Sequence, residues 1–155
     1  MSARIDRRRT LMGGAALIGL GIAGPRPARS DTDTGTDDAE ARIRAFTGGA
    51  IPREGRIALD LPEIAENGGA VRLDLRVDSP MTAEDHVRRV MVVAHGNPSA
   101  GVAEFRFSPL SAVAEVATRI RLGQSQIVTA VAEMGDGSFY AASREVQVTV
   151  GGCVA

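Results

Sequence analysis

The strongest constraint on the fold is an alternation of apolar and charged residues with a period of two, which runs through most of the chain after Arg56. The clearest example is residues 71–77, Val-Arg-Leu-Asp-Leu-Arg-Val. This period places the apolar side chains on one face of a β-strand and the charged side chains on the other. Segments rich in Val, Ile and Leu predict strands at 57–61, 71–77, 87–94, 102–108, 113–122, 126–134, 139–142 and 145–150.

Turn-forming residues separate these segments, at 66–69 (Glu-Asn-Gly-Gly), 78–80 (Asp-Ser-Pro), 96–98 (Gly-Asn-Pro) and 135–138 (Gly-Asp-Gly-Ser). Glycine, asparagine, aspartate and proline each favour the backbone geometry of a tight turn. Seven or eight short strands joined by such turns predict an all-β fold, an immunoglobulin-like antiparallel β-sandwich. The chain has no Trp and only one Cys, so the likeness to immunoglobulins concerns architecture alone.

A short helix is predicted before the strands. Residues 31–36 are polar and of low complexity, which is typical of a solvated linker. Asp37 or Asp38 can then cap a helix that runs to about Phe46, where Gly48 and Gly49 end it. We expect this helix to pack across one end of the sandwich and to form one domain with it, residues 37–150.

The run of apolar residues within 87–94 has two interpretations. Residues 90–93, Val-Met-Val-Val, carry more apolar positions than one buried face needs. An apolar outer face would indicate a partner subunit, and hence a stable heterodimer with a second small β-protein. A central strand buried on both faces gives the same pattern.

The N-terminus has the features of an export signal. Residues 7–9 are all arginine, and residues 11–23 form an uncharged run of apolar and small residues that is too short to span a bilayer. Paired arginines before a mild apolar stretch favour a twin-arginine signal peptide over residues 1–30, with Arg8 and Arg9 as the recognised pair. Cleavage after Ser30 is favoured, and cleavage after Ala23 or Gly24 is the alternative. The expected location is the periplasm, with no membrane span.

Charge excludes one class of partner. The predicted leader carries six of the 18 arginines and one of the 19 acidic residues, which leaves 12 arginines against 18 acidic residues and a net charge of −6. The chain also has no lysine. Nucleic-acid binding needs clustered Lys and Arg, so an acidic chain of this kind is not expected to bind nucleic acid.

The single cysteine, Cys153, is the candidate functional residue. It follows Gly151 and Gly152, which predict a hinge within a flexible C-terminal carrier arm, residues 151–155. An unpaired thiol is a liability in an oxidising compartment unless the protein uses it. No cation or histidine adjoins Cys153 in the sequence to activate it. We therefore expect a covalent attachment point whose chemistry is supplied by partner enzymes.

Other catalytic patterns are missing from the sequence. There is no Gly-x-Ser-x-Gly, no glycine-rich phosphate loop and no paired-histidine motif. His86 and His95 are the only histidines, and with one cysteine they make no metal-ligand cluster of useful spacing. The sequence therefore predicts a non-catalytic subunit without a metal or other cofactor.

Several motifs together resemble a known family. They stand at residues 60–68 (Asp-Leu-Pro-Glu-Ile-Ala-Glu-Asn-Gly), 78–82 (Asp-Ser-Pro-Met-Thr), 97–98 (Asn-Pro), 118–122 (Thr-Arg-Ile-Arg-Leu), 126 (Gln) and 148–153 (Val-Thr-Val-Gly-Gly-Cys). In this order, from about Leu59 to Cys153, they are similar to the thiosulfate-oxidation sulfur carrier, the Y subunit of the bacterial Sox system.

The resemblance implies a periplasmic immunoglobulin-like subunit paired with a Z subunit (SoxZ-like), whose terminal cysteine carries sulfur as covalent adducts. It also implies three transient partners: a c-type cytochrome that loads thiosulfate, a manganese-dependent hydrolase that releases sulfate, and a sulfane dehydrogenase that oxidises the remaining sulfur.

The tail departs from the family pattern. The family ends in Gly-Gly-Cys-Gly-Gly, whereas here Val154 and Ala155 replace the last two glycines and make the tip stiffer and wider. Three possibilities follow: a working carrier with a relaxed tail, a diverged paralogue that serves another periplasmic oxidation pathway, or an interaction module that no longer uses its thiol.

Overall fold

The computed structural model describes residues 32–153. Its elements are α1 (Thr32–Thr47), β1 (Ile57–Asp60), β2 (Ile64–Asn67), η1 (Gly68–Ala70), β3 (Val71–Val77), β4 (Val87–Ala94), β5 (Gly101–Arg106), η2 (Pro109–Ser111), β6 (Ala114–Ile120), β7 (Gln126–Met134) and β8 (Phe139–Val150). The strands form two sheets, one with the order β1-β3-β6 and one with the order β2-β8-β7-β4-β5.

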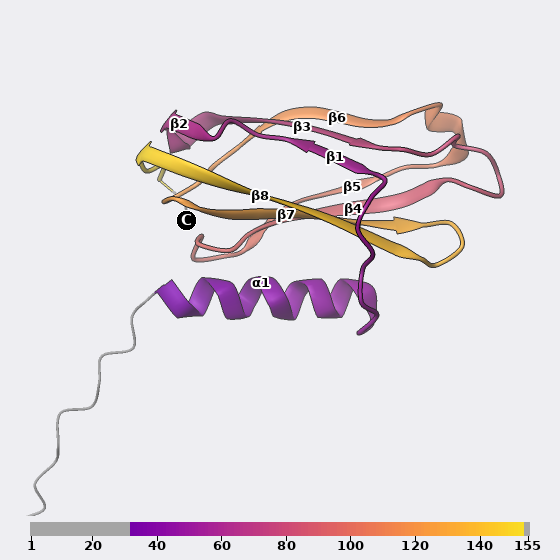
Figure 1. The fold of residues 1–155 in the computed structure, drawn as a ribbon, viewed down its shortest axis with the longest axis horizontal. Helices are drawn as coiled ribbons and strands as arrows, with labels where there is room; N and C mark the ends of the chain where they lie inside the picture. The colour runs from indigo at the N-terminus through magenta and orange to yellow at the C-terminus, as the bar shows by residue number, and fades with distance from the viewer. Residues whose placement is uncertain (1–31, 154–155) are drawn as a thin grey trace, which may run out of the picture.

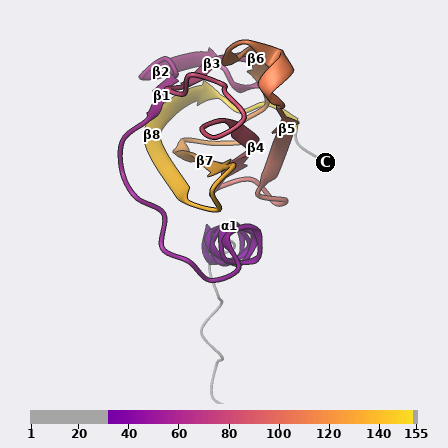
Figure 2. The same cartoon turned by 90° about the vertical axis from the view of Figure 1, so that its right-hand side faces the viewer.

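The two sheets face each other and enclose one main core (Figures 1 and 2). In β3 the burial alternates as the sequence predicts, with Leu73 and Leu75 buried and the charged residues of the strand more exposed. Val90 and Val92 of β4 meet this core from the opposite sheet. The predicted all-β sandwich with a short N-terminal helix is confirmed.

Two strand predictions were wrong. Residues 139–150 form one continuous strand, β8, rather than two short ones. Residues 64–67, expected to hold the start of a turn, form β2, which pairs with β8 in parallel, so the larger sheet is not purely antiparallel. The turn is instead the short helix η1, which follows Asn67. The Asn67 side chain accepts a hydrogen bond from the Gly69 amide at 2.8 Å and caps η1. Ile64 is 63% exposed and the small Ala65 is the buried residue, so β2 lacks the large buried apolar side chains that identify a strand in the sequence.

The predicted linker at residues 31–36 was also wrong, because α1 already begins at Thr32. Gly35 is buried, and a Cβ there would lie 2.6 Å from the carbonyl oxygen of His95. The first turn of the helix therefore packs closely on the loop that follows β4. The predicted end of the helix is confirmed, since Gly48 and Gly49 follow Thr47 with positive φ angles of 62° and 88°.

The helix covers the outer face of the larger sheet rather than one end of the sandwich (Figure 1). Ala39 and Ile43 of α1 pack against Met91 and Val93 of β4. Because Val90 and Val92 point into the sandwich core, β4 is buried on both faces. The apolar run 90–93 is therefore explained within the chain, and its use as a sign of a partner surface was wrong.

Polar contacts anchor the helix at both ends. Asp38 accepts hydrogen bonds from Arg42 Nε at 2.9 Å and from the Ala100 amide at 2.8 Å. These contacts, the Arg42 bond first, lower the pKa of the Asp38 carboxyl below its ordinary value. At the other end, the Arg89 guanidinium lies 4.2 Å from the centre of the Phe46 ring. The helix is thus an integral layer of the domain.

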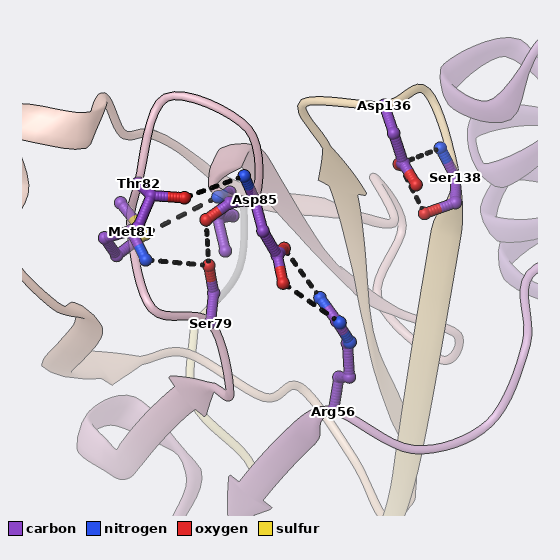
Figure 3. A network of polar contacts seen from close by, with 8 residues as sticks. Arg56, Ser79, Met81, Thr82, Asp85, Asp136 and Ser138 are labelled. Carbon is purple, nitrogen blue, oxygen red and sulfur yellow. Dashed lines mark hydrogen bonds and ion pairs between the residues drawn. The ribbon is translucent and has the colours of Figure 1, made fainter.

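A separate polar network closes the end of the sandwich where the loop between β3 and β4 lies (Figure 3). Arg56 makes two bonds to Asp85, at 2.8 and 3.1 Å. The Ser79 hydroxyl accepts from the Met81 amide and donates to the Asp85 carbonyl oxygen, and Thr82 accepts from the Asp85 amide. These bonds hold Met81 buried although its φ is +53°. The network accounts for the shape of this loop.

No helix among residues 32–153 is long and apolar enough to cross a membrane.

Candidate functional site

Cys153 lies just beyond β8 and is exposed. The strand ends at Val150, and the next two residues carry the chain past the loop between β6 and β7. The Gly152 amide donates to the Leu122 carbonyl oxygen at 2.9 Å, and the Leu122 amide donates to the Gly68 carbonyl oxygen at 2.8 Å. The segment before the thiol is therefore hydrogen-bonded to the body of the domain.

Both glycines of this segment make very close backbone contacts. A Cβ on Gly152 would lie 2.7 Å from the carbonyl carbon and oxygen of Gly68, and one on Gly151 would overlap the Gly123 carbonyl oxygen. Gly68 is equally restricted, because its Cβ would overlap the Leu122 carbonyl oxygen and lie 2.8 Å from the Gly152 nitrogen. The sequence suggested that Gly151 and Gly152 serve as a hinge. The structure adds a second reason for glycine at these positions, the close approach of three backbone segments. The hinge stays a prediction.

Cys153 borders a hollow of about 490 Å³ between the edge strands β5 and β6. These strands belong to different sheets and do not pair with each other, so this side of the sandwich is open (Figure 2). Its walls combine apolar side chains such as Val102 and Phe105 with the polar Thr118, Arg119 and Arg121.

Buried hydrogen bonds fix the loops at this end of the hollow. Asn97 is 6% exposed, and its side chain donates to the Arg121 carbonyl oxygen at 3.0 Å and accepts from the Gly123 amide at 3.0 Å and from Gln126 Nε2 at 2.9 Å. The Gln126 side chain in turn accepts from the Gly96 amide. Asn97 and Gln126 were noted in the sequence only as part of a family resemblance. Their role here is to hold the loop against which the Cys153 segment docks.

The two histidines lie at opposite ends of β4 and do not meet. His95 Nε2 is 3.0 Å from the Thr129 hydroxyl, and burial of the ring lowers the pKa of His95, an effect that Glu40 partly offsets. Nδ1 of His86 is buried without a hydrogen-bond partner. Within residues 32–153, no group of three or more His, Cys, Asp or Glu side chains could hold a metal ion.

The remaining predicted site residues lie outside the described part of the chain. These are Arg8 and Arg9 of the expected export signal, and Val154 and Ala155 of the tail.

The sequence matches the family model described as sulfur oxidation protein SoxY over residues 43–153, well over half of the chain. Among curated proteins, none matches significantly. The fold is similar to the solved structure of the sulfur carrier protein SoxY from Chlorobium limicola f thiosulfatophilum, with 30% sequence identity, a TM-score of 0.60, and coverage of 74% of this chain and 98% of that one.

Two further solved structures are similar in fold only. A superoxide reductase (neelaredoxin) from Ignicoccus hospitalis, variant E23A, is 20% identical with a TM-score of 0.55, over 72% of this chain and 90% of that one. A putative superoxide reductase from Thermotoga maritima is 19% identical with a TM-score of 0.51, over 66% and 89% of the two chains.

Proposed function

Because this chain belongs to the SoxY family of sulfur oxidation proteins, we propose that it is a periplasmic sulfur carrier of thiosulfate oxidation, with the Cys153 thiol as the covalent attachment point. The observation that carries this proposal is the exposed Cys153 at the end of a domain that the family model matches up to that residue. The domain presents the thiol, and partner enzymes perform the chemistry.

In the proposed loading step, the Cys153 sulfur and the outer sulfur of thiosulfate form an S–S bond. The thiol proton leaves, and a c-type cytochrome accepts the two electrons. A manganese-dependent hydrolase then adds water across the bond to the sulfonate, which releases sulfate and leaves a persulfide on Cys153. A sulfane dehydrogenase oxidises that sulfur further. Each enzyme must reach the same thiol, and in this proposal the Cys153 segment leaves its docked position to enter each partner's active site.

The contacts of the docked segment are weak enough to allow its release to partner enzymes. Between Gly152 and the domain there is one backbone hydrogen bond, to Leu122. A single bond of this kind contributes about 1 kcal/mol net, so it holds the segment without preventing release. Val154 and Ala155 stand where the family has glycine. Restoring glycine at both positions should raise turnover with the loading and hydrolysing enzymes if the width of the tip limits entry to their channels.

The proposed stable partner is a SoxZ-like subunit. Since β4 is buried on both faces, the heterodimer now rests on family membership rather than on an exposed apolar strand. Sedimentation of the chain alone and after co-expression with the candidate subunit tests it. If the chain sediments as a monomer in the presence of the candidate subunit, the heterodimer prediction is wrong.

The carrier role is tested with Cys153→Ser. This variant should abolish sulfate formation from thiosulfate in a reconstituted system, while thermal stability and partner binding stay nearly unchanged because a terminal exposed residue contributes little packing. If sulfate formation persists, the carrier role is wrong. If wild-type protein binds its partner but never accepts sulfur, the chain is instead an interaction module or a paralogue in another periplasmic pathway.

Export is tested separately. Lysine does not reproduce the fork-shaped donor geometry of arginine, so replacing Arg7, Arg8 and Arg9 together by lysine should leave the precursor in the cytoplasm. The triple substitution is needed because Arg7 offers an overlapping pair. Normal amounts of mature protein in the periplasm would refute the twin-arginine route.

A further inference from the structure

The strand β5 forms an open edge of the larger sheet. It stands at one end of the strand order, so β4 is its only hydrogen-bonded neighbour within residues 32–153. Figure 2 shows β5 at the open side of the sandwich, across from β6. An edge strand offers a row of unpaired backbone N–H and C=O groups, which another strand can bind.

The register with β4 identifies the free backbone groups of β5. The Phe107 amide donates to the Arg88 carbonyl oxygen at 2.9 Å. In an antiparallel pair, residues that bond to the neighbouring strand alternate with residues whose N–H and C=O point the other way. The register is regular from Arg106 back to residue 103. Phe105 therefore also bonds to β4, whereas Glu104 and Arg106 direct their backbone groups toward the open edge.

The side chains of β5 divide in the same way. Phe105 packs against the main core from this side. Glu104 and Arg106 are exposed, and Arg106 Nε donates to the Glu104 carboxylate at 3.1 Å. Charged side chains often keep an edge strand from pairing with another strand. Here the two charges are opposite in sign and two positions apart, so they cancel along the edge.

This pattern is complementary to itself under a two-fold rotation. If β5 pairs in antiparallel with β5 of a second copy, and the axis passes through Phe105, then Glu104 of each copy lies opposite Arg106 of the other. These are the residues whose backbone groups face the open edge, so each such pair would exchange two backbone hydrogen bonds. Opposite charges would also lie side by side. The same patch would serve both copies, as in an isologous interface.

The other edge of the larger sheet lacks this property. It is β2, which has four residues, and its one charged residue is Glu66. In an antiparallel pairing of β2 with a second β2, no register gives Glu66 a basic residue as its partner. Self-pairing is therefore favoured at β5.

An exposed leucine beside this edge provides an anchor. Leu110 lies in η2, just after β5, and is 95% exposed. In the two-fold arrangement, the chain that leaves β5 of one copy runs toward the start of β5 of the other. The hollow of about 490 Å³ lies there, and its walls include Val102, Phe105 and Ile120. These apolar walls suit the leucine side chain, which is surrounded by solvent in the single chain.

We propose that a second copy of this chain binds along β5, in an antiparallel two-fold arrangement centred on Phe105, with Leu110 of each copy over the hollow of the other. The paired region is one short strand, so the interface belongs to the small, weakly binding class, with an expected Kd on the order of 10–100 µM. This dimer is non-covalent and does not involve Cys153, so it is independent of the carrier role.

Charge reversal tests the register directly. Glu104→Arg places two arginines opposite each other, and Arg106→Glu places two glutamates opposite each other, so each variant alone should raise the Kd at least tenfold. A 1:1 mixture of the two variants should associate like the wild type, because one carries two basic residues and the other two acidic ones. The double variant, with both charges reversed, should also dimerise. Sedimentation at about 5–500 µM protein, a range that brackets this Kd, measures association. Reductant is present to remove disulfide dimers.

The matched controls are Arg72→Glu and Asp74→Arg. These two residues form the same kind of ion pair, two positions apart on one strand, but β3 is the central strand of the smaller sheet. Neither control should change the Kd more than twofold. Leu110→Ser removes the anchor and should raise the Kd about fivefold.

Amide hydrogen exchange gives a second readout. The amides of Glu104 and Arg106 should be protected at high protein concentration and exchange rapidly at low concentration. The Phe105 amide should be protected at both, because its partner is β4.

A chain that stays monomeric over the whole concentration range would overturn the proposal. The same holds if Glu104→Arg and Arg72→Glu weaken the dimer equally, or if the mixture of the two reversed variants fails to associate. If the amides of Glu104 and Arg106 become protected only when a SoxZ-like subunit is added, this edge binds that subunit and the proposal of a second copy is wrong.

Discussion

Replacing Gly68 by alanine should both destabilise the domain and free the segment that carries Cys153. Gly68 is buried, and its added Cβ would overlap the Leu122 carbonyl oxygen while lying 2.8 Å from the Gly152 nitrogen and 2.9 Å from Val148 Cγ1. Two of these three neighbours are backbone atoms, which cannot turn aside as a side-chain end can. The backbone of either Gly68 or Leu122 must therefore move.

The cost has two parts. Overpacking of a tight site typically costs about 1–3 kcal/mol. Movement of Gly68 also weakens the 2.8 Å hydrogen bond from the Leu122 amide, which adds about 1 kcal/mol. We expect a loss of about 2–3 kcal/mol in the free energy of unfolding. For a domain of this size, that lowers Tm by roughly 10 °C.

The matched control is Gly69→Ala. A Cβ there would meet the end of the Asn67 side chain at 3.0 Å and no backbone atom within 4 Å outside its own neighbours, so the change in stability should stay within about 0.5 kcal/mol. Urea denaturation measures both variants. Hydrogen exchange at the Gly152 amide, which donates to Leu122, reports docking of the arm and should accelerate in Gly68→Ala alone. Equal stability of the two variants, with the Gly152 amide equally protected, would refute the steric account.

Three further predictions concern pH and oxidation. Burial lowers the pKa of His95 in the folded state, so as the pH falls the unfolded chain binds the proton first, and the free energy of unfolding should fall below about pH 6.5. In urea denaturation at pH 5–7, His95→Gln should flatten this dependence on pH. If the free energy of unfolding depends on pH equally in the variant and the wild type, the prediction is wrong. Asp38 has a lowered pKa because of Arg42, so its contribution to stability is present above about pH 4 and is lost as the pH falls through the folded-state pKa. In urea denaturation, Asp38→Ala should cost about 1 kcal/mol at pH 7, more than Asp38→Asn, and this cost should shrink as the pH falls below about 4; a cost that does not change with pH would contradict it. Oxidation of the isolated chain should give reductant-sensitive dimers through Cys153 on non-reducing gels, and Cys153→Ser should stay monomeric.

The sheets could be predicted where one face of a strand is buried and the other wet. In β3, alternation alone locates both ends, because each apolar residue enters the core and each charged one is more exposed. In β4 the same argument is ambiguous, because the side chains of residues 90–93 alternate between two apolar clusters. One cluster lies inside the sandwich and the other beneath α1. Whether residues 90–93 mark a partner surface or a strand buried on both faces depends on where the helix packs. The sequence of the strand alone does not predict the position of the helix.

The start of the helix was missed for a related reason. Its contact face includes Gly35 and Ala39, which pack closely because they are small and leave no hydrophobic pattern in the sequence. Small, polar residues over 31–36 therefore resembled a linker, although α1 already begins at Thr32.

At the candidate site, the sequence led to the prediction of Cys153 and its two glycines as functional residues, but it did not reveal their surroundings. Flexibility and close approach both select glycine, and the contact with Gly68, more than 80 positions away, is visible only in the folded chain. Likewise, the residues at the end of β6 line one hollow with Cys153 only because this strand ends beside the docked segment.

The most direct test of the carrier role is the mass of the peptide that contains Cys153. The protein should be purified under non-reducing conditions from cells grown on thiosulfate and from cells grown without it. We predict sulfur-containing additions on Cys153 in the first sample only, removed by reductant, and in no other peptide. Unmodified Cys153 in cells that are actively oxidising thiosulfate, with the protein present and bound to its partner, would contradict the account.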